Sequence, residues 1–456
     1  MNKKKPKLLL INPGKEEKWS VSEPLQLLYL ATFIKQNGFN VKISDEQAGD
    51  DVFSDIKNFS PDYIGVTATT PLANRAYEIL RKVKNDNNIT SIIGGVHATV
   101  MPNEAKKYAD IVVVGEGEES LLNILEKNIK RGVIEKPLKK SIDSYPFPER
   151  DFINQDFYSK AKDRLGDVVS HLYFLPPNTK VATVLTSRGC PRRCIFCHNS
   201  WRFTPLRSNS SKRVIEELEY LIKNYGIKAI FFMDDNFLVN KKRIFEVCSL
   251  IKKKNLDFIW GCNASAHFIN DEVLSRIKKA GCREIVFGFE SGSQKILNLL
   301  GKGTSVEMNE KALRLCKKYN FDVTTSFMVG NPQETEEDIK LTQKFIRDNI
   351  NYIDMYGVNI TTPYPGTKLW DDCVKSKIIA KNTNWSMFSQ DNTNLICSSL
   401  PKDKLEELYL ETFAIQKLSL SRMVSKLFSN LPNYFSLAYR HPLKSLKILI
   451  KILKRN

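Results

Sequence analysis

The chain has 456 residues with a formal net charge of +18, and 42% of its residues are hydrophobic while 26% are charged. This length predicts two or three domains, and this composition excludes disordered, collagen-like and disulfide-scaffold proteins. The excess of positive charge favours an anionic partner, such as lipid headgroups or nucleic acid, without identifying one.

The N-terminus has no recognisable secretion signal, because its basic residues are followed by only four apolar residues, 8–11. No apolar run approaches the roughly 20 residues that span a bilayer. The chain has nine cysteines, an odd number, and the first of them is Cys190. This pattern is typical of a protein in a reducing compartment. We therefore expect a cytoplasmic protein.

Short apolar strands alternate with helical stretches over the first 140 residues. The alternation predicts a parallel, doubly wound sheet with helices on both faces, in which ligands bind at the carboxyl ends of the strands. The expected strands cover residues 7–12, 41–44, 63–68, 91–95 and 110–115, and expected helices cover 24–37 and 74–83.

Three loops at these strand ends combine glycine with polar side chains. Glycine lets the backbone approach a bulky ligand, and hydroxyl and loop N–H groups can hold amides or phosphate. An equally good interpretation on local sequence is that the glycines only form turns and that the histidine is a buried polar residue. No G-x-G-x-x-G follows the first strand, which disfavours a nicotinamide-type dinucleotide site. The candidate ligand contacts are Thr67, Thr69, Gly94, Gly95, His97, Thr99, Gly115, Glu116 and Gly117.

The segment 181–201 reads VATVLTSRGCPRRCIFCHNSW, a strand followed by a loop with cysteines at 190, 194 and 197. Packing does not explain three thiols within eight residues, so this spacing predicts a metal centre. A zinc ion with His198 as its fourth ligand and an iron–sulfur cluster with one iron free of protein ligands both fit the spacing. An open iron suits catalysis, because a substrate or cofactor can bind it directly.

Strands and helices alternate again from residue 181 to about 370, which predicts a β/α barrel or part of one. Functional residues in such barrels lie at the carboxyl ends of the strands, where this chain carries polar motifs. The expected strands cover 227–233, 258–264, 284–289, 323–329 and 354–360, and expected helices cover 211–225 and 270–280.

The C-x3-C-x2-C motif, with an aromatic residue before its last cysteine, resembles the signature of the radical S-adenosylmethionine (SAM) enzymes. FFMDDNF at 231–237, FGFESGS at 287–293, TTSFMVGNPQET at 324–335 and NITTPYPGT at 359–367 resemble later family segments in the same order. The resemblance implies a 4Fe-4S cluster held by Cys190, Cys194 and Cys197, whose fourth iron chelates SAM. The SAM-site residues it implies are Phe196, Asp234, Asp235, Glu290, Ser291, Val329, Gly330 and Pro332.

A doubly wound domain directly before such a barrel resembles the cobalamin-binding subclass of these enzymes. The Asp-x-His-x-x-Gly loop, which supplies a lower cobalt ligand in other cobalamin proteins, is missing here, and Asn12-Pro-Gly14 ends the first strand. We therefore expect cobalamin to be bound without a protein imidazole, with His97 as a contact and not as a cobalt ligand.

The resemblance implies a reaction in which a 5′-deoxyadenosyl radical removes hydrogen from a substrate carbon and methylcobalamin then donates its methyl group. Radical cyclisation or rearrangement is the alternative within the class, and a cobalamin-binding sensor with an inactive barrel is the alternative outside it. We expect a small-molecule substrate, hydrophobic ones included, and a one-electron donor such as flavodoxin or ferredoxin.

The C-terminal region from 412 to 456 has nine basic residues and no acidic residue, and lysines flank a wide apolar face in its last 16 residues. This pattern is typical of a helix at an anionic membrane surface and equally of a terminal helix packed on the barrel. Nucleic acid is disfavoured, because this helix offers no aromatic residues for base stacking. The expected division is a cobalamin-binding domain at 1–142, a linker at 143–180, a radical SAM barrel at 181–400 and a helical, basic extension at 401–456.

Overall fold

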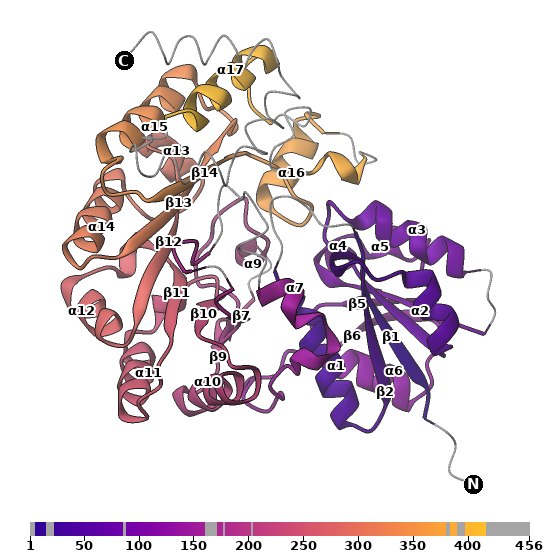
Figure 1. The fold of residues 1–456 in the computed structure, drawn as a ribbon. Coiled ribbons are helices and arrows are strands. Elements are labelled where there is room, and N and C mark those ends of the chain that lie inside the picture. Colours follow the sequence, from indigo (N-terminus) through magenta and orange to yellow (C-terminus); the bar gives the residue numbers. More distant parts are fainter. Residues whose placement is uncertain are drawn as a thin grey trace.

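The computed structural model describes residues 5–14, 22–84, 88–159, 171–176, 178–201, 204–379, 384–389 and 397–415. Two lobes make up this part of the chain, and each is built on a six-stranded parallel sheet (Figure 1). None of the helices in these ranges is both long enough and apolar enough to cross a membrane.

The sheet of the N-terminal lobe is covered by helices on both faces. Its buried strands are therefore apolar on both sides: Leu8 and Leu10 pack on one face while Leu9 and Ile11 pack on the other. Helices α1 (Leu25–Gln36) and α6 (Glu118–Glu126) cover the first face. The second carries α2 (Val52–Phe59), α3 (Ala73–Val83), α4 (Gly95–Val100) and α5 (Pro102–Ala105). In spatial order the strands are β2 (Asn40–Asp45), β1 (Lys7–Asn12), β3 (Tyr63–Thr67), β4 (Thr90–Gly94), β5 (Ile111–Val114) and β6 (Gly132–Glu135).

The second sheet is an open part of a β/α barrel, with helices on its outer side (Figure 1). In spatial order its strands are β14 (Met355–Ile360), β13 (Asp322–Val329), β12 (Cys282–Glu290), β11 (Ile259–Ala264), β10 (Ala229–Phe232) and β7 (Val181–Val184). The helices between them include α10 (Ser211–Tyr225), α11 (Lys241–Lys253), α12 (Asp271–Lys279), α14 (Val306–Lys318) and α15 (Glu336–Asn349). The predicted doubly wound sheet and partial barrel are both confirmed.

Local capping explains why these helices begin and end where the sequence predicts. The side chain of Ser210 accepts the N–H of Arg213 at the start of α10, and Gly226 ends that helix with φ of 65°. Asn270 caps α12 in the same way, through the N–H of Val273.

The N-terminal lobe docks on β7, an edge strand of the barrel sheet. The carboxylate of Glu23 accepts the N–H of Thr183 at 2.7 Å, and the guanidinium of Arg150 donates to the carbonyl of Thr183 at 2.7 Å. The hydroxyl of Tyr29 donates to the carbonyl of Leu185 at 3.1 Å. Side chains thus satisfy backbone groups that a neighbouring strand would otherwise pair.

The C-terminal part of the described chain packs on both lobes. α16 (Lys368–Lys375) and the turn at 385–388 contribute Trp370, Trp385 and Phe388 to the core beneath α3. Leu405 and Leu408 of α17 (Lys402–Phe413) belong to the barrel core, so this helix is part of the barrel lobe. The predicted basic tail beyond residue 415 lies outside the described residues.

Candidate functional site

The three clustered cysteines lie in a loop that starts from a two-residue strand, β8 (Ser187–Arg188). This strand pairs with β9 (Arg207–Ser208). Gly189 follows with φ of +87°, and a Cβ atom there would lie 2.7 Å from the carbonyl oxygen of Pro205. The loop therefore needs glycine immediately before Cys190, because other residues would both strain the backbone and collide with it.

The three thiols are shielded from solvent to different degrees, with Cys194 buried and Cys190 and Cys197 partly exposed. Burial raises the pKa of Cys194 to about 11 and also raises that of Cys190, and a thiolate at Cys197 would add to both increases. Thiolate sulfurs are the ligands that hold iron–sulfur clusters in proteins, so the chemistry of this donor set fits a 4Fe-4S cluster. Binding would require the thiols to lose their protons.

The two adjacent acids that follow β10 have different roles. Asp234 is fully buried and accepts hydrogen bonds from the backbone and hydroxyl of Thr186 and from the hydroxyl of Ser187, so it ties β10 to the start of the cysteine loop. Asp235 accepts the side-chain N–H of Asn199 at 2.8 Å, and its charge is felt by Cys190. Asp235 is partly open to solvent, but the protein that surrounds its carboxyl group raises its pKa, and the charge of Asp234 adds to this. Of the pair, Asp235 is the one that faces the cysteines.

Glu290 ends β12 beside the same thiols. It is a non-glycine residue with φ of 66°, a rare conformation that clusters at functional sites. Its carboxylate lies 2.6 Å from the Nζ atom of Lys302, whose charge acts on Cys194 and Cys197. The ammonium also lies 5.9 Å from the ring centroid of Phe196. The structure therefore brings Phe196 and Glu290 together with Lys302, which the sequence analysis missed.

The remaining residues predicted for the SAM site differ in how deeply they are buried. The hydroxyl of Ser291 lies 3.1 Å from that of Thr342 in α15, and this buried contact stabilises the loop that follows β12. Val329 is fully buried at the end of β13, and Pro332 is half-buried. Gly330 has φ of +83° and donates its N–H to Glu334 at 2.7 Å. Burial raises the pKa of Glu334 to about 7.

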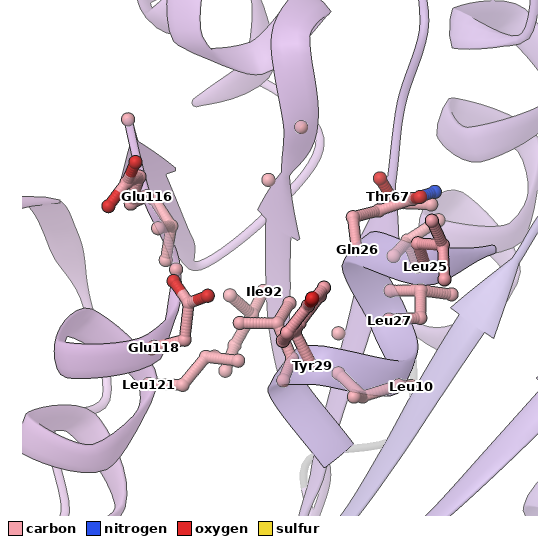
Figure 2. A pocket seen from close by; sticks show the side chains of 18 of the residues that line it. Leu10, Leu25, Gln26, Leu27, Tyr29, Thr67, Ile92, Glu116, Glu118 and Leu121 are labelled. Carbon is pink, nitrogen blue, oxygen red and sulfur yellow. The ribbon is translucent and has the colours of Figure 1, made fainter. Parts of the chain in front are cut away.

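The loops of the N-terminal lobe meet at a cavity of about 340 Å³ between its sheet, α1 and α6. Leucines and Tyr29 make most of its wall apolar, as in many small-molecule sites. Figure 2 shows Glu116 and Glu118 on one side and Thr67 on the other. The barrel lobe contributes Leu185 and Arg188. The predicted contacts that line this cavity are Thr67, Gly94, Gly95, Gly115, Glu116 and Gly117.

Glycine is required at Gly95, where the backbone approaches its neighbours closely. Its φ is +90°, and a Cβ atom there would lie 2.8 Å from backbone atoms of Ala68. Glycine here therefore allows the end of β4 to pack closely against the end of β3. The cavity lies at the carboxyl ends of the strands, where a doubly wound domain binds its ligand, and this place fits the cobalamin predicted from the sequence.

The other three predicted contacts lie away from the cavity lining. The ring of His97 is fully buried, 3.2 Å from the hydroxyl of Thr70 and 3.1 Å from that of Tyr77, and its centroid lies 4.8 Å from that of Trp385. It is a satisfied polar residue in the core that the N-terminal lobe shares with the turn at 385–388. Thr99 accepts the N–H of Gly115 at 3.0 Å and so supports a loop that lines the cavity, while Thr69 is exposed.

Two family models match the chain in the order that the fold suggests. The B12 binding domain matches residues 20–125, and the Radical SAM superfamily matches residues 184–346. An uncharacterized methyltransferase of Pyrococcus horikoshii is 34% identical over 416 residues, which cover 84% of this chain and 86% of that protein. The anaerobic magnesium-protoporphyrin IX monomethyl ester cyclase of Rubrivivax gelatinosus is 29% identical and covers 76% of this chain, which spans 66% of that protein.

Among solved structures, the cobalamin-dependent SAM radical enzyme OxsB with aqua-cobalamin and SAM bound has the same fold. Its TM-score is 0.70 at 17% identity, and the match covers 99% of this chain and 75% of that chain. The resemblance drawn from the cysteine motif and the doubly wound domain is thus confirmed. The chain belongs to the radical SAM superfamily, among the members in which a B12-binding domain precedes the radical SAM domain.

Proposed function

We propose that this protein is a cobalamin-dependent radical SAM enzyme that transfers a methyl group to a substrate carbon. The observation that carries the proposal is the placement of Arg188, which lines the cavity of the B12-binding lobe two residues before the first cysteine of the cluster motif. One short segment thereby serves both cofactor sites. The methyltransferase among the relatives supports methyl transfer over other radical reactions.

Each group of residues has a distinct part in this function. Cys190, Cys194 and Cys197 hold the 4Fe-4S cluster, and Asp235, Glu290 and Lys302 offer polar groups to SAM at its edge. Thr67, Gly94, Gly95, Gly115, Glu116 and Gly117 accept cobalamin. When bound, these cofactors supply a 5′-deoxyadenosyl radical and a methyl group. The protein orients them and keeps water away from the radical.

Radical cyclisation is the second candidate, and the likeness to the cyclase of Rubrivivax gelatinosus favours it. The two reactions differ in their products. Methyl transfer adds one methylene unit to the substrate mass and converts a second SAM to S-adenosylhomocysteine. Cyclisation removes hydrogens and adds no carbon.

The test is anaerobic reconstitution with iron, sulfide and hydroxocobalamin, followed by incubation with SAM and a reductant. We expect stoichiometric cobalt and formation of both 5′-deoxyadenosine and S-adenosylhomocysteine, with 5′-deoxyadenosine absent from the Cys190→Ala variant. Iron without cobalt would contradict the cobalamin assignment. Continued formation of 5′-deoxyadenosine by Cys190→Ala would contradict the cluster assignment.

We further propose a hydrophobic small-molecule substrate, flavodoxin or ferredoxin as electron donor, and peripheral membrane contact through the basic tail. Support comes from the sequence of residues 412–456, where lysines flank apolar residues. Removing residues 416–456 is expected to abolish sedimentation with vesicles that contain anionic lipid, while SAM cleavage persists. Unchanged sedimentation would contradict the membrane proposal.

A further inference from the structure

Arg188 belongs to the radical SAM lobe, but its side chain is held by the B12-binding lobe. One guanidinium nitrogen lies 2.6 Å from a carboxylate oxygen of Glu118, and another lies 3.2 Å from Glu116. The guanidinium also lies 5.4 Å from the ring centroid of Tyr29 and 5.0 Å from that of Tyr145. With only 15% of the side chain exposed, Arg188 has little freedom to adopt another position.

The geometry of β8 directs this side chain away from the barrel. Side chains alternate along a strand, so neighbours face opposite ways. The hydroxyl of Ser187 bonds to Asp234 of the barrel, and Arg188 points to the other lobe and lines the cavity. Arg207, which lies opposite Arg188 in β9, also donates to Glu116, at 3.2 Å. Glu116, in the loop after β5, therefore binds arginines from both short strands, β8 and β9.

The path from Arg188 to the first cysteine is short, because only Gly189 separates them. The chain at Gly189 runs so close to the neighbouring segment that a Cβ atom there would lie 2.7 Å from the carbonyl oxygen of Pro205, which leaves little space on that side. We therefore expect a displacement of Arg188 to reach Cys190. On its other side, Arg188 shares the cavity wall with Glu116 and Glu118, so a ligand that fills the cavity restricts the same segment.

We propose that Arg188 is a positioning residue that couples cobalamin binding to the order of the cysteine loop. The inference rests on the proposed function. Cobalamin restricts the segment from the cavity side, and the cluster restricts it through Cys190. Whichever binds first removes conformational freedom that the second would otherwise have to remove. Because such coupling is reciprocal, the cluster must tighten cobalamin binding by the same factor by which cobalamin tightens cluster binding.

The experiment titrates hydroxocobalamin into the full chain in two states, with the cluster reconstituted and after its removal by a chelator. We expect wild-type protein to bind cobalamin about fivefold or more tightly when the cluster is present, the lower range of ordinary allosteric coupling. In Arg188→Met this ratio should approach one, although iron per chain in the reconstituted protein stays at the wild-type value. Arg283→Met, which removes an exposed pair with Asp322 on the barrel, is the control and should keep the ratio.

Glu118→Gln provides a second variant in case Arg188→Met does not fold. It keeps the shape of the partner but removes the charge that lies 2.6 Å from the guanidinium, so the ratio should fall here too. A wild-type ratio of one, or a variant ratio equal to wild type, would overturn the coupling and leave the proposed function standing. Failure of wild-type protein to bind cobalamin in either state would overturn both.

Discussion

Lys302 places a buried positive charge beside thiols that become negative when they bind iron. Burial alone would lower its pKa, but Glu290 and Cys194 raise the pKa on balance, so the ammonium stays charged. A cation near a cluster favours the reduced, more negative state. Lys302, held by Glu290, therefore places a positive charge close to the thiols at this edge of the barrel.

Replacing Lys302 by Met should make the bound cluster harder to reduce. We expect its midpoint potential to fall by roughly tens of millivolts, the order for one charge within about 10 Å at an effective dielectric constant of about 20. Lys302→Arg should restore most of the difference. Potentiometric titration followed by electron paramagnetic resonance measures the shift, and Lys318→Met, at an exposed pair with Asp271, is the control. An unchanged potential in Lys302→Met would refute the electrostatic role.

Glu284 is a second buried charge, inside the barrel, and it should make stability depend on pH. It accepts the N–H of Leu172 at 2.7 Å and the hydroxyl of Thr324 at 2.8 Å, and burial raises its pKa to about 7. An unfolded glutamate titrates near 4.3. Because the folded state holds the proton more tightly, this group's contribution to stability is lost as pH rises from about 4 to 7.

Glu284→Gln should remove this pH dependence, since Gln keeps an acceptor and carries no charge. We expect the free energy of unfolding of the variant, minus that of wild type, to increase by about 2 kcal/mol from pH 5 to pH 8. Urea unfolding of both proteins at the two pH values gives the difference. Glu310→Gln, which removes an exposed helical pair with Arg314, should show no such growth. If this difference in unfolding free energy does not change with pH, the pKa of Glu284 is not raised by folding.

At the scale of elements, the short strand β8 and the glycine after it determine where the cysteine loop begins. Gly189→Ala should cost far more than Gly226→Ala, although both glycines have positive φ, because only the first new Cβ would meet the backbone. We expect Gly226→Ala to cost about 1 kcal/mol and to keep the cluster. Gly189→Ala should retain less than about half of the wild-type iron after reconstitution, measured with sulfide on folded protein. Equal iron in the two variants would argue against a fixed entry to the loop.

The elements that carry the site were predictable because their signals are local. Apolar periodicity located strands such as β3 and β13, and the spacing of Cys190, Cys194 and Cys197 predicts a metal centre directly. Contacts between distant segments gave no such signal. Arg188 and Lys302 appear functional only when the fold brings them to Glu118 and to the thiols. Nor does sequence separate neighbours such as Asp234 and Asp235, whose roles depend on which way each side chain turns.

At the scale of the whole molecule, the two cofactor lobes keep their relative position through buried polar groups on the edge of β7. Glu23 and Arg150, 3.0 Å apart, pair with each other and with the backbone of Thr183. Both side chains are almost completely buried. Loss of one member of such a pair leaves the other charge buried without compensation, which costs more than loss of an exposed pair.

Glu23→Gln should therefore weaken the docking of the lobes. The amide oxygen still accepts the N–H of Thr183, but the charge of Arg150 loses its partner, at a cost of about 3 kcal/mol or more. We expect calorimetry to show one thermal transition for wild type and two for the variant, with faster proteolysis between the lobes. Glu149→Gln is the matched control, because its pair with Lys35 joins the same region but is more exposed than that of Glu23 and Arg150, and it should cost less than about 1 kcal/mol. If both variants unfold alike, docking must rest on the apolar core that α16 shares with the N-terminal lobe and not on the edge of β7.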